Sequence, residues 1–321
     1  RDLGSGQEDG AESVSLQPLR RIDSPSERAW AAEWLAAILA GEGVDLDPAA
    51  KEHLWTALCS LASAPPAERT LTGLVVLLQD MRLKQALAPF CLSGPWGQLL
   101  DGEEEGLSSN TCQVFETEGL VGSGAPAGDL SYLFHRIEGE LDGPPTLILI
   151  DEGWLVLDSP MFAAQLREWL KTLRKKNASV LFATQSLADI ERSAIAPAII
   201  ESCPTRIFLP NERAIEPQIA AIYQRFGLNE RQIEILAGAT PKRDYYVQSR
   251  SGNRLIDLGL DDVALAFTAA SSRTDQDRIS AILAQSESGG FGGAWLRSRG
   301  FDWAADLLSI IVKEMAHVPH S

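Results

Sequence analysis

Two adjacent carboxylates, Asp151 and Glu152, directly follow a short apolar run that ends at Ile150. A run of this length, rich in leucine and isoleucine, is typical of a strand buried on both faces of a parallel sheet. Chemistry in such sheets gathers at the carboxyl ends of the strands. The pair therefore fits a Walker B strand, in which Asp151 holds Mg²⁺ beside a nucleoside triphosphate and Glu152 polarises the attacking water. A core strand that leaves the sheet into a solvated acidic turn explains the same residues equally well.

Two further apolar runs, 179–183 and 206–209, are also followed by polar residues. Thr184 and Gln185 come after the first run, and Asn211 comes after the second and one proline. In a doubly wound sheet such strand ends face one crevice, where nucleotides bind. We expect Gln185 to orient the lytic water or to sense the γ-phosphate, because an amide both donates and accepts. Thr184 and Asn211 are expected to contact the nucleotide, although Thr184 and Gln185 could simply cap their strand.

Two arginines, Arg174 and Arg243, are candidate arginine fingers. A guanidinium group stays charged and matches phosphate oxygens in a bidentate way. Arg174 lies with Lys175 and Lys176 at the end of an amphipathic helix expected over 159–177. Cations at a helix carboxyl terminus are favourable without any ligand, so this cluster has a purely structural explanation as well. Arg243 could likewise be an ion-pairing residue of a hairpin.

The pattern Gly-x-x-x-x-Gly-Lys-Ser/Thr is missing from the sequence. The stretches around Gly4-Ser5-Gly6 and Gly122-Ser123-Gly124 have the glycines but lack the lysine and hydroxyl that grip phosphates and magnesium. Without that loop the chain is not a complete P-loop NTPase. Because it starts at Arg1 and continues into a polar, glycine-rich stretch, we expect a piece cut from something longer. The alternative is that it is not a nucleotide hydrolase.

The overall composition excludes some classes of protein. With 321 residues and a formal net charge of −16, the chain is not expected to coat nucleic acid or anionic lipid through bulk charge. Its apolar runs stay below the roughly 20 residues that span a bilayer, so no transmembrane segment is expected. The cysteines lack ligand-like spacing and are expected to be buried apolar side chains in a reducing compartment; they are Cys59, Cys91, Cys112 and Cys203.

The elements that must position these residues alternate along the middle of the chain. Strands are expected at 112–116, 147–150, 179–183 and 206–209, and helices at 130–141, 159–177 and 187–200. Strands and helices that alternate at these lengths indicate βαβ units with right-handed crossovers. The expected fold class is therefore α/β with a mostly parallel sheet.

The flanking patterns suggest further elements. A helical pattern covers about 24–100 and begins with a capping box from Ser24 to Glu27, after a possible edge strand at 14–19. Two short helices, a hairpin, a further strand at 263–267 and a helical tail follow the middle of the chain. The expected segments are the start of a truncated core at 1–23, an all-α subdomain at 24–110, an α/β core at 111–270 and a helical tail at 271–321.

Five stretches carry a resemblance to a known family: residues 24–34, 147–154, 169–177, 182–186 and 240–246. Together they resemble the TrbE-type conjugal-transfer ATPases of type IV secretion systems, in their carboxyl-terminal RecA-like domain. The match extends over most of residues 10–270, and the combination is specific even though the Walker B run alone is not. The resemblance implies a RecA-like P-loop NTPase core with an all-α insertion, and it implies that the phosphate loop lies upstream of Arg1.

By this resemblance Asp151 and Glu152 are the Walker B pair, with Asp151 as the metal ligand. Arg174 is the motif arginine ahead of the third strand, Gln185 is the sensor glutamine, and Arg243 is a further candidate for acting across a subunit boundary. The implied cofactors are ATP and Mg²⁺. The implied partners are further copies in a ring, often a hexamer, the coupling protein and other inner-membrane secretion components, at the cytoplasmic face of the bacterial inner membrane.

Three functions remain open at this point. The first is a fragment of a secretion or conjugation motor ATPase, inactive by itself for lack of the phosphate loop. The second is a non-enzymatic docking module whose helical block and tryptophan-rich tail bind other secretion proteins. The third is a DNA-pumping coupling protein or helicase-like ATPase, which salt-dependent contact of Arg174, Lys175 and Lys176 with single-stranded DNA would favour. The formal net charge of −16 argues against the third function.

Overall fold

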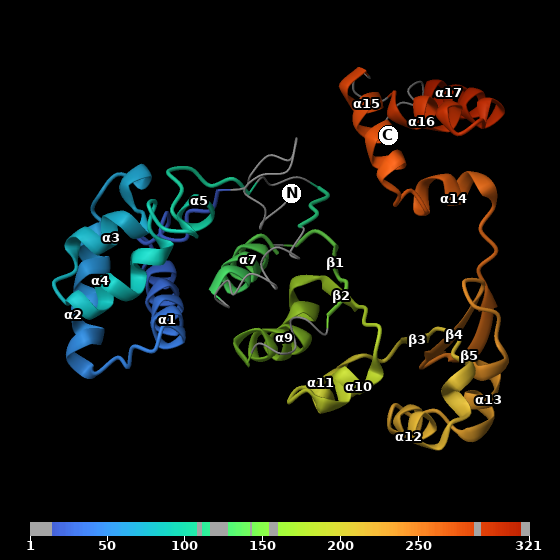
Figure 1. The fold of residues 1–321 in the computed structure, drawn as a ribbon, viewed down its shortest axis with the longest axis horizontal. Helices are drawn as coiled ribbons and strands as arrows, with labels where there is room; N and C mark the ends of the chain where they lie inside the picture. The colour runs from blue at the N-terminus through green and yellow to red at the C-terminus, as the bar shows by residue number, and fades with distance from the viewer. Residues whose placement is uncertain are drawn as a thin grey trace. The chain divides into compact units, whose positions relative to one another are not determined.

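The structure, a computed structural model, describes residues 15–107, 111–115, 128–141, 143–153, 160–285 and 290–315 (Figure 1). The chain divides into two compact units, Arg1–Cys203 and Pro204–Ser321. The four segments at 1–23, 24–110, 111–270 and 271–321 remain a prediction. Within the described ranges, no helix combines the length and the apolar character needed to cross a membrane.

The first unit begins with a helical block around one apolar core that includes Leu35, Leu58 and Leu74, all fully buried. Proline and a side-chain cap set the start of its second helix, where Asp47 accepts a 2.7 Å hydrogen bond from the Ala50 amide. The helical pattern predicted for this region is confirmed. Its helices are α1 (Pro25–Gly41), α2 (Pro48–Leu61), η1 (Pro66–Glu68), α3 (Leu71–Leu77), α4 (Met81–Leu87), η2 (Ala88–Phe90) and α5 (Gly97–Leu100).

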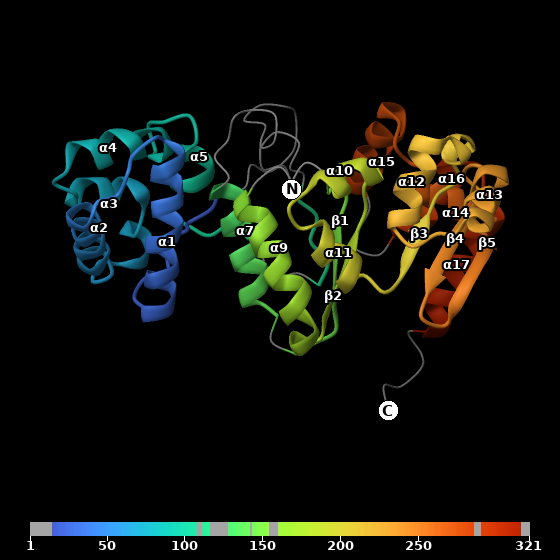
Figure 2. The ribbon, with the colours of Figure 1, turned by 90° about the horizontal axis from the view of Figure 1, so that it is seen from below.

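Two parallel strands, β1 (Thr146–Ile150) and β2 (Ala178–Phe182), follow the helical block. They pair from Thr146 opposite Ala178 to Ile150 opposite Phe182. Helices α7 (Gly128–Gly139) and α9 (Pro160–Thr172) lie next to each other beside this pair (Figure 2). The turn η3 (Leu173–Lys176) leads into β2, and α10 (Leu187–Arg192) and α11 (Ala196–Ser202) follow it. The predicted β-α-β unit around residues 147–183 is confirmed.

Within the described ranges this strand pair is covered on one face only, which corrects the expectation of strands buried on both faces. Ile148 and Ile150 are half-buried, whereas Leu147 and Leu149 are 61% and 66% exposed. Successive side chains of a strand point to opposite faces, so each strand shows this alternation. Among the described residues, helices reach only one of the two faces.

The second unit holds an antiparallel sheet in the order β3–β4–β5, with bounds Arg206–Phe208, Asp244–Ser249 and Gly252–Asp257. The run at 206–209 was expected to be a third strand of the parallel sheet, and this expectation is wrong. Phe208 lies opposite Tyr246, and both side chains are buried. β3 therefore forms its backbone hydrogen bonds with β4 of the hairpin. The turn η4 (Glu212–Ile215) and helices α12 (Pro217–Arg225) and α13 (Glu230–Gly238) complete this part.

Four helices close the second unit: α14 (Asp262–Thr268), α15 (Arg273–Gln285), α16 (Phe291–Ser298) and α17 (Asp302–Met315). The helical tail was predicted, but the strand expected at 263–267 is wrong. Asp261 accepts a 2.8 Å hydrogen bond from the Ala264 amide and so caps α14 as a helix. A 2.9 Å hydrogen bond from Trp295 Nε1 to the Ala266 carbonyl joins α16 to α14.

Three other local expectations are also wrong. Residues 15–23 form irregular chain and turns instead of an edge strand, because Leu16, Leu19 and Ile22 are buried in the helical core. Residues 112–115 are irregular, and Glu116 lies outside the described residues. No capping box forms at α1, since Ser24 contacts Ser26 and the carboxylate of Glu27 lies 3.1 Å from His135.

The cysteines do not share one environment. Cys91 is buried as expected, Cys59 and Cys203 are half-buried, and Cys112 is exposed. The expectation of four buried apolar thiols is therefore correct for Cys91 alone.

Candidate functional site

The two carboxylates lie in the turn that follows β1. Because Ile150 is paired with Phe182, the residues after both strands emerge at the same end of the pair. Asp151 and Glu152 are both exposed. The Glu152 amide donates a 2.9 Å hydrogen bond to Oδ1 of Asp151, which fixes the aspartate against its own turn.

The contact that defines the site joins Glu152 to Gln185. Nε2 of Gln185 donates a 2.8 Å hydrogen bond to Oε1 of Glu152. Glu152 has a φ of 48°, in the left-handed region that costs a non-glycine residue about 1–2 kcal/mol. Thr184 directly precedes Gln185 and is half-buried, and its hydroxyl lies 3.4 Å from the Ser186 amide. The structure thus brings together Asp151, Glu152, Thr184 and Gln185, as the sequence predicted.

Gly153 holds the turn close to the neighbouring strand. Its amide donates a 2.9 Å hydrogen bond to the Ala183 carbonyl, and the Ala183 amide donates a 2.8 Å bond to the Ile150 carbonyl. A Cβ atom at position 153 would lie 2.2 Å from the ring of Phe182. Only glycine therefore allows this approach, and the approach sets the distance between the carboxylate turn and Gln185.

The sequence analysis did not single out Glu138 of α7. Its side chain joins α7 to α9 and η3 through hydrogen bonds. Its carboxylate accepts hydrogen bonds from Lys176 Nζ at 2.9 Å, Trp169 Nε1 at 3.1 Å and Gln165 Nε2 at 3.2 Å. Burial raises the pKa of Glu138, but the hydrogen bonds from Lys176 and Trp169 outweigh burial and place the pKa below its usual value. The partners lie 27 to 38 residues away, so no local pattern in the sequence marks this glutamate.

Arg174 does not join the carboxylates within the chain. It is exposed in η3, before β2, whereas Gln185 follows β2. Five strand residues at about 3.3 Å each put roughly 16 Å between those two ends. Lys176, which belongs to the same basic cluster, forms an ion pair with Glu138. An action of Arg174 on a nucleotide at Asp151 would therefore have to come from another copy of the chain.

Asn211 and Arg243 belong to the second unit, and both have local structural roles there. Oδ1 of Asn211 accepts a 3.1 Å hydrogen bond from the Arg213 amide, and its Nδ2 donates at 3.1 Å to the Tyr223 hydroxyl. Arg243 makes a bidentate ion pair with Asp257 at 2.7–3.0 Å, which lowers the pKa of Asp257. The nucleotide roles of both residues remain predictions.

Comparison with known proteins finds relatives that match almost the whole chain. The family model described as TraG P-loop domain matches residues 134–259. A probable conjugal transfer protein TrbE of Sinorhizobium fredii is 44% identical over 313 residues, which are 96% of this chain and 46% of the relative. The conjugal transfer protein TrbE of Rhizobium radiobacter is 44% identical over 92% of this chain and 36% of its own length. Over nearly all of its length the chain is therefore similar to part of the TrbE conjugal transfer proteins.

A solved structure confirms the fold class. VirB4 of Thermoanaerobacter pseudethanolicus superposes with a TM-score of 0.58 at 17% identity, over 78% of this chain and 75% of that chain. Together with the matching P-loop family model, this shows a P-loop NTPase-like fold. The chain spans 46% and 36% of the lengths of the two TrbE relatives, so about half or less of each.

The donor set of the chain fits Mg²⁺ held jointly with a nucleotide. In the described ranges, no group of three or more histidine, cysteine or carboxylate side chains could hold a metal alone. Mg²⁺ in nucleotide sites is commonly bound by one or two carboxylates plus phosphates and water. Asp151 and Glu152 are exposed carboxylates at the edge of a parallel strand pair, and such carboxylates fit a partial site of this kind.

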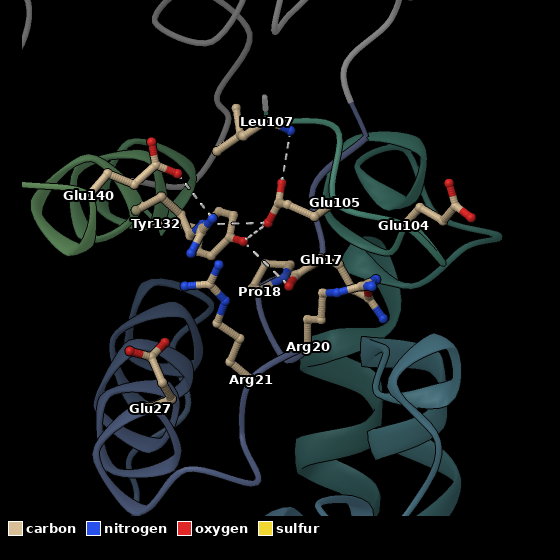
Figure 3. A pocket seen from close by; sticks show the side chains of 11 residues that line it. Gln17, Pro18, Arg20, Arg21, Glu27, Glu104, Glu105, Leu107, Tyr132 and Glu140 are labelled. Carbon is tan, nitrogen blue, oxygen red and sulfur yellow. Dashed lines mark hydrogen bonds and ion pairs between the residues drawn. The ribbon is translucent and has the colours of Figure 1, made fainter. Parts of the chain in front are cut away.

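A separate cavity of about 420 Å³ lies between the helical block and α7, and none of the predicted site residues lines it (Figure 3). Three arginines and four glutamates line it, so its charge is mixed and does not suit a phosphate. Arg136 is buried, with Nη2 3.4 Å from Glu140 and Nε 3.7 Å from Glu105. Burial and the contact with Glu105 raise the pKa of Tyr132. These contacts anchor α7 to the helical block.

Proposed function

We propose that this chain carries the Walker B half of a motor ATPase that serves conjugation or type IV secretion. The observation that carries the proposal is the 2.8 Å contact between Gln185 and Glu152 at the shared end of two parallel strands. The TrbE relatives support it, because their names describe conjugal transfer proteins. Hydrolysis would drive substrate transfer or pilus assembly.

The residues divide the chemistry as follows. Asp151 would hold the Mg²⁺ of bound Mg-ATP, and the ion would neutralise part of the phosphate charge. Glu152 accepts the proton of the water that attacks the γ-phosphate. Gln185 holds Glu152 through its Nε2 and presents an amide oxygen that can orient the same water. Thr184, next to Gln185, would contact the nucleotide.

The phosphate loop comes from another part of a longer polypeptide. The printed sequence lacks the loop pattern, and the relatives are at least twice as long as the matched region. We expect the chain by itself to hydrolyse ATP poorly or not at all. The full protein would work as a ring, as a hexamer in the simplest case, at the cytoplasmic face of the inner membrane with the coupling protein and other secretion components.

The test replaces Glu152 by glutamine in the full-length product of the reading frame. The amide oxygen of Glu152→Gln still accepts the bond from Gln185, so the turn is kept while the base is lost. We expect ATP hydrolysis to fall by about 10²–10⁴-fold with ATP binding retained. Glu168→Gln, an exposed change on α9, is the matched control. Unchanged turnover in Glu152→Gln would remove the role given to Glu152.

A docking module is the second candidate, because α17 exposes several large apolar side chains. A chain that binds secretion proteins but never hydrolyses ATP, even at full length, would fit that function. The DNA-pumping alternative is weakened, because Lys176 is already engaged by Glu138 and the net charge is −16.

A further inference from the structure

The cavity between the helical block and α7 contains a buried arginine with an incomplete set of hydrogen bonds. Tyr132 and Arg136 line the cavity from α7, where a spacing of four residues puts them on one face of the helix. Arg136 is 7% exposed, and its Nη2 lies 3.4 Å from Glu140. Within the described ranges, its Nε has no hydrogen-bond partner. Buried N–H groups are nearly always paired, so this Nε–H marks a position for an acceptor.

Glu105 lies beside the Nε of Arg136 but does not satisfy it. Its Oε2 is 3.7 Å from Nε, which is beyond the usual length of a hydrogen bond. Both oxygens of Glu105 already accept other hydrogen bonds, Oε2 from the Tyr132 hydroxyl and Oε1 from the Leu107 amide at 3.2 Å (Figure 3). Because these bonds hold Glu105 in place, the Nε–H is left to an acceptor in the cavity.

Arg21 offers a second guanidinium group to the same cavity. Its side chain points toward Tyr132 (Figure 3). Burial raises the pKa of Tyr132 and the positive charge of Arg21 opposes this rise, so the guanidinium lies near the phenol. In the part of the chain that the structure describes, the Arg21 side chain forms no hydrogen bond or ion pair, whereas Arg20 donates a 2.9 Å bond to Gln17. Arg21 therefore has its full set of donors available.

The charges around the cavity fit one carboxylate better than a phosphate. Guanidinium N–H groups form strong, charge-assisted hydrogen bonds with the two oxygens of a carboxylate. A doubly charged phosphate would lie among the four glutamates that also line the cavity, where like charges repel it. The volume of about 420 Å³ suits a small molecule. Pro18 and Leu107 line the cavity as well and offer contact to an apolar body.

We propose that this cavity binds a small organic monocarboxylate with a short apolar body. The Nε–H of Arg136 donates to the carboxylate, and the guanidinium of Arg21 donates to it as well. Arg136 belongs to α7, whereas Arg21 precedes α1, so the ligand joins α7 to the helical block. The site lacks all the residues proposed for ATP hydrolysis and does not depend on that function.

NMR of the arginine Nε–H groups tests the proposal on the whole chain. The probe is sodium benzoate, and benzamide is its uncharged match. We expect benzoate to move the Nε–H signal of Arg136 with a Kd of about 1 mM or below, and benzamide to leave it in place. Arg136→Lys keeps the charge but lacks this signal, so it assigns the resonance. A signal that benzoate does not move, or that benzamide moves equally, overturns the proposal.

Substitution of Arg21 distinguishes a built site from general attraction between charges. Arg21→Gln is expected to weaken benzoate binding about tenfold, since it removes a charged donor. Circular dichroism should stay unchanged, because the Arg21 side chain has no partner to lose among the described residues. Arg192→Gln, an exposed change on α10, is the matched control and leaves the Kd as it is. Benzoate binding that is insensitive to Arg21→Gln, or inorganic phosphate that binds more tightly than benzoate, overturns the proposal.

Discussion

Nε2 of Gln185 donates a 2.8 Å hydrogen bond to Oε1 of Glu152, although the two residues are 33 positions apart in the chain. The bond joins the turns that follow two neighbouring parallel strands. It holds a glutamate with a φ of 48° against an amide that can also reach a water molecule or a phosphate. The proposed catalytic base and its positioning residue are thus in direct contact.

Replacing Gln185 separates a positioning role from a structural one. Gln185→Ala in the full-length protein is expected to lower ATP hydrolysis about 10²-fold through loss of a preorganised donor. Gln185→Glu places a second carboxylate beside Glu152, which raises the pKa of the pair and moves the acid limb of the pH–rate profile to higher pH. Gln218→Ala, at an exposed position of α12, is the control. A profile that does not move in Gln185→Glu contradicts the assignment.

Arg174 is expected to act across a subunit boundary if it acts on nucleotide at all, because β2 separates it from Glu152. Full-length Arg174→Ala and Glu152→Gln proteins are each expected to lose hydrolysis. Mixing them forms interfaces with one intact Glu152 and one intact Arg174, so activity partly returns. Steady-state phosphate release from mixtures at several ratios measures this. If the mixtures show only the summed hydrolysis of the two separate variants, Arg174 does not act on nucleotide and serves only as a cation at the end of its helix.

Gly153→Ala tests the close approach of the carboxylate turn to β2. The added methyl group would overlap the ring of Phe182, and such overpacking typically costs about 1–3 kcal/mol. Gly139→Ala, at a position of α7 with nothing within 4 Å of the added atom, is expected to cost nothing. Urea unfolding of the chain compares the two. Equal stability of both variants would show that the turn relaxes freely.

Glu138 predicts a dependence of stability on pH. Its pKa in the folded chain lies below the unfolded value of 4.5, so its stabilisation is present above that pH and is lost as pH falls through the folded pKa. Glu138→Gln is expected to cost about 1–2 kcal/mol at pH 7. The difference from the wild type should shrink below pH 4.5 in chemical unfolding experiments. Glu168→Gln, an exposed change on α9, is a control for charge alone. A difference that stays constant with pH would contradict the ionic origin.

Much of the fold and part of the site follow from the sequence. The apolar run before Asp151, the amphipathic pattern of α9 and the run before Thr184 predict a β-α-β unit, because period and length are local properties. Parallel pairing then puts the residues after both strands at one edge, which is why the grouping of Asp151, Glu152 and Gln185 was predictable. The family resemblance rested on the same local stretches and is confirmed by the TrbE relatives.

Only the tertiary structure decided the long-range relationships. The apolar run at 206–209 has the same local pattern in either sheet, and the burial of Phe208 against Tyr246 assigned it to the antiparallel one. The run at 263–267 became helix α14 because Asp261 caps it, which strand propensity does not reveal. Glu138 and Gly153 owe their roles to partners far from them in the chain, and periodicity carries no information on such partners.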